Sequence, residues 1–126
     1  MRALVALLLV VAAGCFAAAA TAAAEHAEIT SCGTVVGAKW VFPGTGGKLS
    51  GNKYGVTANG VSCAVAKKYA VKLSGTKLPG KKTGANYPLA GGPKGYTCHG
   101  NPDANGKLIA GSCKLGTNYF LWSGRP

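Results

Sequence analysis

Five cysteines in a chain of 126 residues constrain this sequence more than any other feature. Cys15 lies in an apolar N-terminal segment, and the other four are spread over the rest of the chain: Cys32, Cys63, Cys98 and Cys113. Without Cys15 the count is four, and an even number of cysteines in a short exported chain is typical of a disulfide framework. A zinc site is the competing interpretation, but the sequence has no Cys-x-x-Cys pair and no histidine at the spacing of zinc ligands. We therefore predict two disulfides and no metal site.

Four cysteines allow three pairings. We favour Cys32–Cys63 together with Cys98–Cys113, because the second pair flanks residues 100–106, a segment rich in Gly and Asn that resembles a hairpin loop. In the chain-entropy estimate, closing loops of this size stabilises a domain by about 3–4 kcal/mol for each disulfide. A domain of about 100 residues has a small core, so we expect these links to matter for stability.

The N-terminus has the organisation of a secretory signal. Arg2 gives a positive start, residues 4–11 form an apolar run, and small residues ending at Ala24 fit a cleavage site. The apolar run is short for a transmembrane helix, which needs about 20 residues. We expect a secreted, extracellular protein, divided into three parts: residues 1–24 as signal peptide, 25–31 as N-terminal lead-in and 32–126 as disulfide-linked domain.

A lipoprotein signal is the alternative interpretation of the same segment. Residues 12–15, Ala-Ala-Gly-Cys, resemble a bacterial lipobox with Cys15 as the lipidated residue, although Ala12 stands where Leu is usual. Lipidation would anchor the protein to a membrane instead of releasing it.

The hydrophobic pattern of the remaining chain predicts an α+β fold. Alternating apolar residues indicate strands at 34–42, where Trp40 and Phe42 share one face, and at 54–58. Small apolar residues at spacings of three and four predict one packed helix from Ser62, its N-cap, to Leu73. Three further strands are expected at 95–99, 107–114 and 118–122. The predicted order is ββαβββ with a mostly antiparallel sheet, and residues 74–95, rich in Gly, Pro and Lys, are expected to be a structureless loop.

The distribution of charge is the strongest functional signal. Fourteen Lys and Arg oppose three Asp and Glu, which gives a formal net charge of +11. Between Glu28 and Asp103 the sequence has ten lysines and no acidic residue. Such a surface attracts anions, although lysines on a helix are also typical of a solvated face. We identify six candidate anion-binding residues within the predicted helix and loop: Lys67, Lys68, Lys72, Lys77, Lys81 and Lys82.

Catalytic residue sets are scarce. His99 and Asp103 could form a dyad that orients an imidazole for base catalysis, but the neighbouring nucleophile, Cys98, is expected to be in a disulfide. The sequence offers no carboxylate pair of the glycosidase kind and no phosphate-binding glycine loop. We therefore expect a protein that is not an enzyme and that carries no cofactor.

The surroundings of the four cysteines form an ordered series of short motifs. These are Cys32-Gly33, residues 60–66 (Gly-Val-Ser-Cys-Ala-Val-Ala), residues 95–98 (Gly-Tyr-Thr-Cys), residues 111–116 (Gly-Ser-Cys-Lys-Leu-Gly) and residues 120–122 (Phe-Leu-Trp). The series resembles a group of small secreted four-cysteine domains common in high-GC Gram-positive bacteria. The resemblance implies an exported α+β domain with two disulfides. It implies no activity, and no functional residue carries over.

Two hypotheses of function follow. In the first, the protein is an exported, non-enzymatic domain whose Lys-rich helix and loop bind an anionic cell-surface or extracellular polymer. In the second, it is a secreted protein-targeting module, an inhibitor or toxin-like factor, that inserts the 74–95 loop into a protein partner through Leu78-Pro79 or Tyr87-Pro88. The prevalence of Lys over Arg disfavours specific recognition of nucleic acid. Membrane contact is expected only if Cys15 is lipidated.

Overall fold

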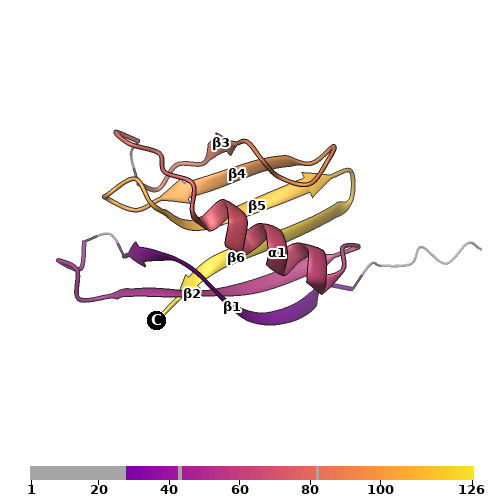
Figure 1. Ribbon diagram of the computed structural model, residues 1–126, viewed down its shortest axis with the longest axis horizontal. Coiled ribbons are helices and arrows are strands. Elements are labelled where there is room, and N and C mark those ends of the chain that lie inside the picture. The colour runs from indigo at the N-terminus through magenta and orange to yellow at the C-terminus, as the bar shows by residue number, and fades with distance from the viewer. Residues whose placement is uncertain (1–27, 43, 82) are drawn as a thin grey trace, which may run out of the picture.

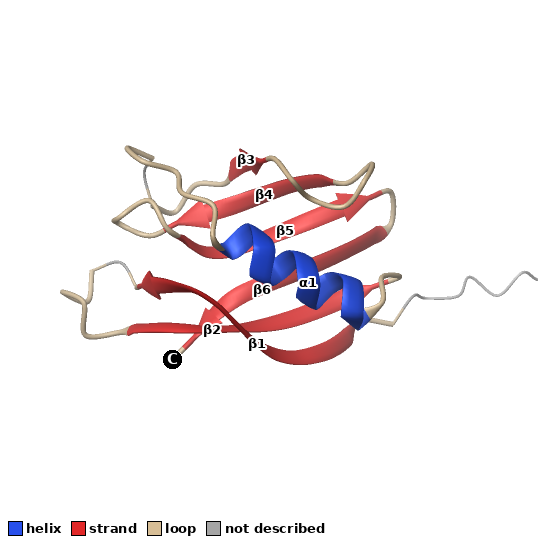
Figure 2. Cartoon of the chain, in the orientation of Figure 1, coloured by secondary structure: helices blue, strands red, loops and turns tan. Residues whose placement is uncertain are grey.

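The computed structural model describes residues 28–42, 44–81 and 83–126. The expected signal peptide, Cys15 and Lys82 lie outside these residues. Seven elements follow one another along the chain: β1 (Thr30–Val41), β2 (Ser50–Asn59), α1 (Cys63–Ser74), β3 (Tyr87–Leu89), β4 (Thr97–Pro102), β5 (Leu108–Leu115) and β6 (Asn118–Arg125). The strands form one antiparallel sheet in the order β1-β2-β6-β5-β4-β3 (Figure 1). The helix α1 crosses one face of the sheet, which we call the helix face; the opposite face is the open face (Figure 2).

The predicted fold class is confirmed, but the predicted order of elements is wrong by one strand. The order is ββαββββ, because β3 forms inside the segment that was expected to be structureless. This strand has three residues and pairs with β4 at the outer edge of the sheet. Pro88 is compatible with such an edge position, and Leu89 is buried. Three residues with a central proline carry no periodicity, so the strand is invisible in the sequence pattern.

The core lies between α1 and the middle of the sheet. On β2, Tyr54 and Val56 point to the helix face and are buried, and on β6 Phe120 and Trp122 do the same. The helix contributes mostly small side chains to this core; Ala66, Ala70 and Leu73 are all buried. Because the sheet supplies the large aromatic rings, small residues on the helix allow the two layers to pack closely.

The predicted start of the helix is confirmed. Ser62 has extended backbone angles, and its hydroxyl accepts a hydrogen bond of 3.3 Å from the N–H of Val65. This bond satisfies one of the N–H groups that a helix leaves free at its first turn.

No helix within the described ranges is long and apolar enough to cross a membrane.

Both favoured disulfides are present. Cys32–Cys63 joins β1 to the first residue of α1, and Cys98–Cys113 joins directly opposite residues of β4 and β5. Cys32 is an extra residue in the β1–β2 register, and the next residue, Gly33, has a φ of 76°. This bulge requires the conformational freedom of glycine, and it places the Cys32 side chain in the buried core below the helix.

The end of β1 departs from the sequence prediction. Trp40 is buried as expected, but Phe42 is 48% exposed although it was assigned to the same face. The β1–β2 register shifts between Val36 and Trp40, and β1 ends at Val41. Simple alternation therefore fails in this part of the strand.

Three buried polar residues, which we call the polar junction, connect the elements below the helix C-terminus: Tyr54, Ser74 and Asp103. One carboxylate oxygen of Asp103 accepts a hydrogen bond from the N–H of Val41 at 2.9 Å. The other accepts from the N–H groups of Asn105 and Lys107 at 2.8 and 3.0 Å. Asp103 thus fixes the β4–β5 turn and attaches the end of β1 to it.

Tyr54 and Ser74 complete this junction. The Tyr54 hydroxyl lies within hydrogen-bond distance of two backbone carbonyl oxygens, those of Ala38 at 2.7 Å and Leu108 at 3.0 Å. The Ser74 hydroxyl donates to the Val71 carbonyl and accepts from the N–H of Ala38. A Cβ at Gly37 would lie 2.5 Å from the Ser74 oxygen and 3.0 Å from the Tyr54 ring, so only glycine allows this approach.

We expect Asp103→Ala to destabilise the domain strongly. The substitution leaves three backbone N–H donors without their buried acceptor, which costs about 3 kcal/mol or more in the free energy of unfolding. Urea titration followed by tryptophan fluorescence measures the change. Asn105→Ala, which removes an exposed side chain from the same turn, is the control and is expected to stay within about 0.5 kcal/mol of the parent. Equal losses in the two variants would contradict a structural role for the carboxylate.

Tyr54 predicts a loss of stability at alkaline pH. Burial, assisted by the nearby Asp103 charge, raises the pKa of Tyr54 from 10.0 to about 12, against a smaller opposing effect of Ser74. The unfolded chain therefore loses this proton before the folded one, so the contribution is complete below pH 10 and declines as the pH rises towards 12. Comparison of the parent with Tyr54→Phe isolates it from the titration of lysines. By about pH 11 the parent should have lost about 1 kcal/mol more than the variant; parallel pH profiles would exclude this role.

Candidate functional site

Five of the six candidate lysines lie in the described part of the chain. Lys67, Lys68 and Lys72 are on α1; Lys77 follows the helix, where it forms an isolated β-bridge with Lys107. Lys81 lies further along the same connection towards β3. The structure therefore distributes the set over the helix and the segment that follows it, as the sequence indicated.

The helix lysines do not all share one direction. Each residue turns an α-helix by about 100°, so Lys68 and Lys72, four residues apart, differ by only about 40°. Lys67 points about 100° or more away from both and is partly buried, whereas Lys68 and Lys72 are exposed. The ring of Tyr69 lies next to the exposed pair, with its centroid 5.7 Å from the Lys68 nitrogen and 5.6 Å from the Lys72 nitrogen.

The surface that carries Lys68 and Lys72 extends from α1 towards β3. The Lys72 side chain passes beside Gly91, in the loop that follows β3. The Lys81 nitrogen lies 5.1 Å from the centroid of the Tyr87 ring, and Tyr87 shares its strand face with the buried Leu89. We call the resulting surface the basic face; it consists of Lys68, Lys72 and Lys81 with Tyr69 and Tyr87.

No carboxylate in the described part of the chain neutralises this face. The described residues include two acidic side chains, Glu28 and Asp103, and neither forms an ion pair with a lysine among them. Asp103 is fully buried and its oxygens accept backbone N–H bonds. The lysine–tyrosine contacts are cation–π interactions of about 0.5–1 kcal/mol at exposed sites, which orient the ammonium groups and leave their charge in place.

The structure does not support a His99–Asp103 dyad. His99 lies on β4 directly opposite Ser112 of β5, and both residues line a shallow depression of about 450 Å³ on the open face. The Asp103 carboxylate is instead buried in the polar junction, where its oxygens accept hydrogen bonds from backbone N–H groups. Cys98 is in a disulfide, as expected. Across the described ranges, no group of three or more His, Cys, Asp or Glu residues is placed to hold a metal ion.

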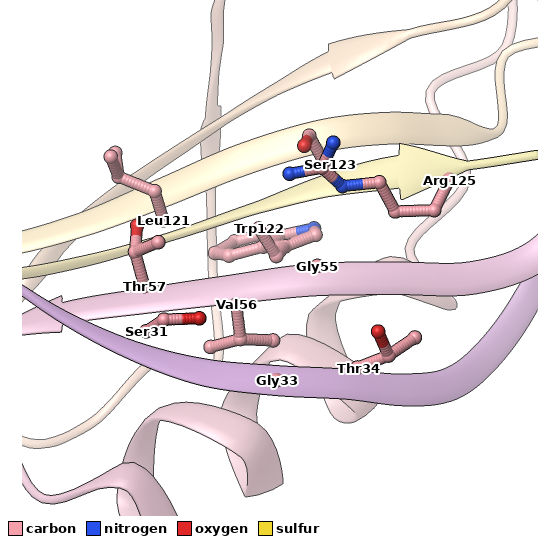
Figure 3. Close-up of a pocket in the computed structure, with 10 residues that line it drawn as sticks. All are labelled: Ser31, Gly33, Thr34, Gly55, Val56, Thr57, Leu121, Trp122, Ser123 and Arg125. Carbon is pink, nitrogen blue, oxygen red and sulfur yellow. The ribbon is translucent and has the colours of Figure 1, made fainter.

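A second depression, of about 600 Å³, lies on the open face at the other edge of the sheet, and no sequence pattern indicates it (Figure 3). Strands β1, β2 and β6 form it, and its lining combines hydroxyl side chains with one guanidinium group: Ser31, Thr34, Thr57, Ser123 and Arg125. Arg125 lies beyond the end of the last predicted strand, and only the strand register brings these five residues together.

Comparisons with known proteins add no relative. No family model matches the chain, and searches of curated proteins and of solved structures found no match. The resemblance to secreted four-cysteine domains therefore stays a prediction, and the functional argument depends on the chain's own geometry.

The unneutralised charge predicts that salt stabilises the fold. Raising sodium chloride from about 10 to 300 mM shortens the Debye length from about 30 Å to under 8 Å and weakens repulsion between lysines. We expect the thermal unfolding midpoint to rise by a few degrees, and to rise less in Lys68→Gln/Lys72→Gln. A midpoint that falls with salt would instead indicate a surface stabilised by ion pairs.

Proposed function

We propose that the chain is an exported, non-enzymatic domain that binds an anionic polymer through its basic face. The observation that carries the proposal is that Lys68, Lys72 and Lys81 lie on the helix side of the sheet, and no carboxylate of the described residues neutralises them. The two disulfides fit an extracellular protein, and anionic polymers of the cell surface or extracellular space are the partners such a protein meets.

The form of the basic face supports a polymer as the ligand. All three of its lysines are exposed and stand on a helix and a connecting segment, outside the two depressions of the open face. A lysine ammonium is a compact charge with three donors, and it does not impose the planar geometry of an arginine fork. Such a surface suits repeated, mobile anionic groups along a chain, and its binding energy comes mainly from counterion release and Coulomb attraction.

The protein-targeting alternative receives less support from the structure. Leu78, one proposed anchor, is partly buried against the core, and its N–H donates to the Gly106 carbonyl at 2.6 Å. Tyr87, the other, is partly buried in β3 beneath Lys81. Both side chains contribute to the domain itself, so fewer apolar groups remain for insertion into a partner.

We expect the triple variant Lys68→Gln/Lys72→Gln/Lys81→Gln to elute from a heparin column at markedly lower salt than the parent. If each lysine releases about one counterion on binding, the slope of log affinity against log salt should fall by roughly 2–3. Heparin serves as a defined anionic polymer, and a cell-wall teichoic acid provides a second test.

The matched control is Lys48→Gln/Lys53→Gln/Lys114→Gln, which removes the same charge from exposed positions outside the basic face. Its retention should fall clearly less than that of the first variant. Equal losses would mean that only net charge matters and would refute a localised site. Circular dichroism of both variants verifies that the fold is retained.

A further inference from the structure

The larger depression on the open face has a regular arrangement of hydroxyl groups. The strand register aligns Ser31 with Thr57 in one row, and Thr34 with Gly55 and Ser123 in the next. Neighbouring strands lie about 4.8 Å apart, so the backbones of β1 and β6 place these hydroxyl groups about 10 Å apart across the depression. Figure 3 shows them around the hollow, together with Arg125.

Two glycines leave this surface hollow and admit the arginine. A Cβ at Gly33 would meet no atom within 4 Å, so this position opens onto free space. A Cβ at Gly55 would lie 2.6 Å from Nε of Arg125 and 3.3 Å from one of its terminal nitrogens. The guanidinium of Arg125 therefore lies directly over Gly55, the residue that pairs with Ser123 in the strand register. No described carboxylate forms an ion pair with this guanidinium.

The chemistry of these groups suits a charged sugar. A guanidinium presents a planar fork of donors that binds carboxylate or phosphate oxygens in pairs. Ser and Thr hydroxyls both donate and accept, which matches the hydroxyl groups of a saccharide. The volume of about 600 Å³ lies within the range of small-molecule sites and is larger than a single inorganic anion needs.

We propose that this depression is a binding site for a sugar that bears one oxyanion group, either a carboxylate or a phosphate. Arg125 binds the oxyanion, and the hydroxyls of Ser31, Thr34, Thr57 and Ser123 bind the sugar hydroxyls. The site lies on the face opposite α1, so it is separate from the basic face and does not depend on the function proposed for that face.

Titration of the ¹⁵N-labelled protein with D-glucuronate and with D-glucose 6-phosphate tests the site by NMR. D-glucose and inorganic phosphate are the comparison probes. We expect saturable shifts of the amide signals of Thr57 and Ser123 with at least one anionic sugar, and binding at least about tenfold weaker for D-glucose, which lacks the partner of Arg125. The anionic sugar that binds with the higher affinity identifies the preferred oxyanion as a carboxylate or a phosphate.

Three variants test the assignment of residues. Arg125→Gln should weaken binding about tenfold or more, because it removes the charged fork. Gly55→Ala should also weaken it by displacing the guanidinium, and it should fold normally because Gly55 does not have a positive φ. Lys114→Gln removes the same charge from the open face outside this depression, and should leave affinity within about twofold.

Four results with the sugar probes and the Arg125 variant would overturn the proposal. These are the absence of shifts with both anionic sugars, equal affinity for inorganic phosphate alone, equal affinity for D-glucose, and binding that survives Arg125→Gln. The triple lysine variant of the basic face should bind the sugars as the parent does. Loss of sugar binding in that variant would place the ligand on the basic face and reject the open-face site, whereas loss of heparin retention alone concerns only the polymer.

Discussion

The buried carboxylate of Asp103 holds together the part of the fold where β1, the β4–β5 turn and the end of α1 meet. Its oxygens accept three backbone hydrogen bonds, one of them from Val41, which is 62 residues away in the chain. Tyr54 and Ser74 extend this junction to β5 and to the helix. The two disulfides act at other places, at the helix N-terminus and between β4 and β5. The disulfides and the polar junction therefore stabilise different parts of a small domain. The same arrangement has an electrostatic consequence, because one of the few acidic side chains of the chain is buried and cannot neutralise the surface lysines.

Much of the fold could be predicted from the sequence where local chemistry decides the structure. Ser62 caps the helix because its hydroxyl accepts a hydrogen bond from the N–H of Val65, the third residue of the helix. The burial of Tyr54, Val56 and Ala58 follows from the period of two in a strand. The hairpin loop at residues 100–106 favours the cysteine pairing that the structure contains. The strand β3 could not be predicted, because its three residues pair only in the presence of β4. Phe42 is exposed because β1 ends at Val41, so the alternation that buries Trp40 does not continue to the residue after the strand.

The candidate sites differ in how far the sequence reveals them. The lysines of the basic face were found because charge is visible residue by residue, but the sequence did not show that Lys67 points away from Lys68 and Lys72. Nor did it show that two tyrosines lie under the ammonium groups. The open-face depression was missed altogether. Its residues come from three strands with ordinary composition, and the feature that unites them, an arginine lying over Gly55, exists only in the register of β2 with β6.

The sheet separates the two proposed sites, and this separation assigns them different physical roles. The binding proposed at the basic face would depend on exposed lysines, so its strength would change steeply with ionic strength and little with the identity of the polymer. The binding proposed in the open-face depression would depend on hydroxyl groups at fixed spacing and on one oriented guanidinium fork, so its strength would change with the stereochemistry of the ligand. A polymer built from acidic sugars satisfies both surfaces only where its chain passes around an edge of the sheet. On the β1 side that edge carries the bulge at Cys32 and Gly33, which also borders the depression. The Cys32–Cys63 disulfide fixes this bulge to the start of α1, and it therefore links the geometry of the open face to the helix that carries Lys68 and Lys72.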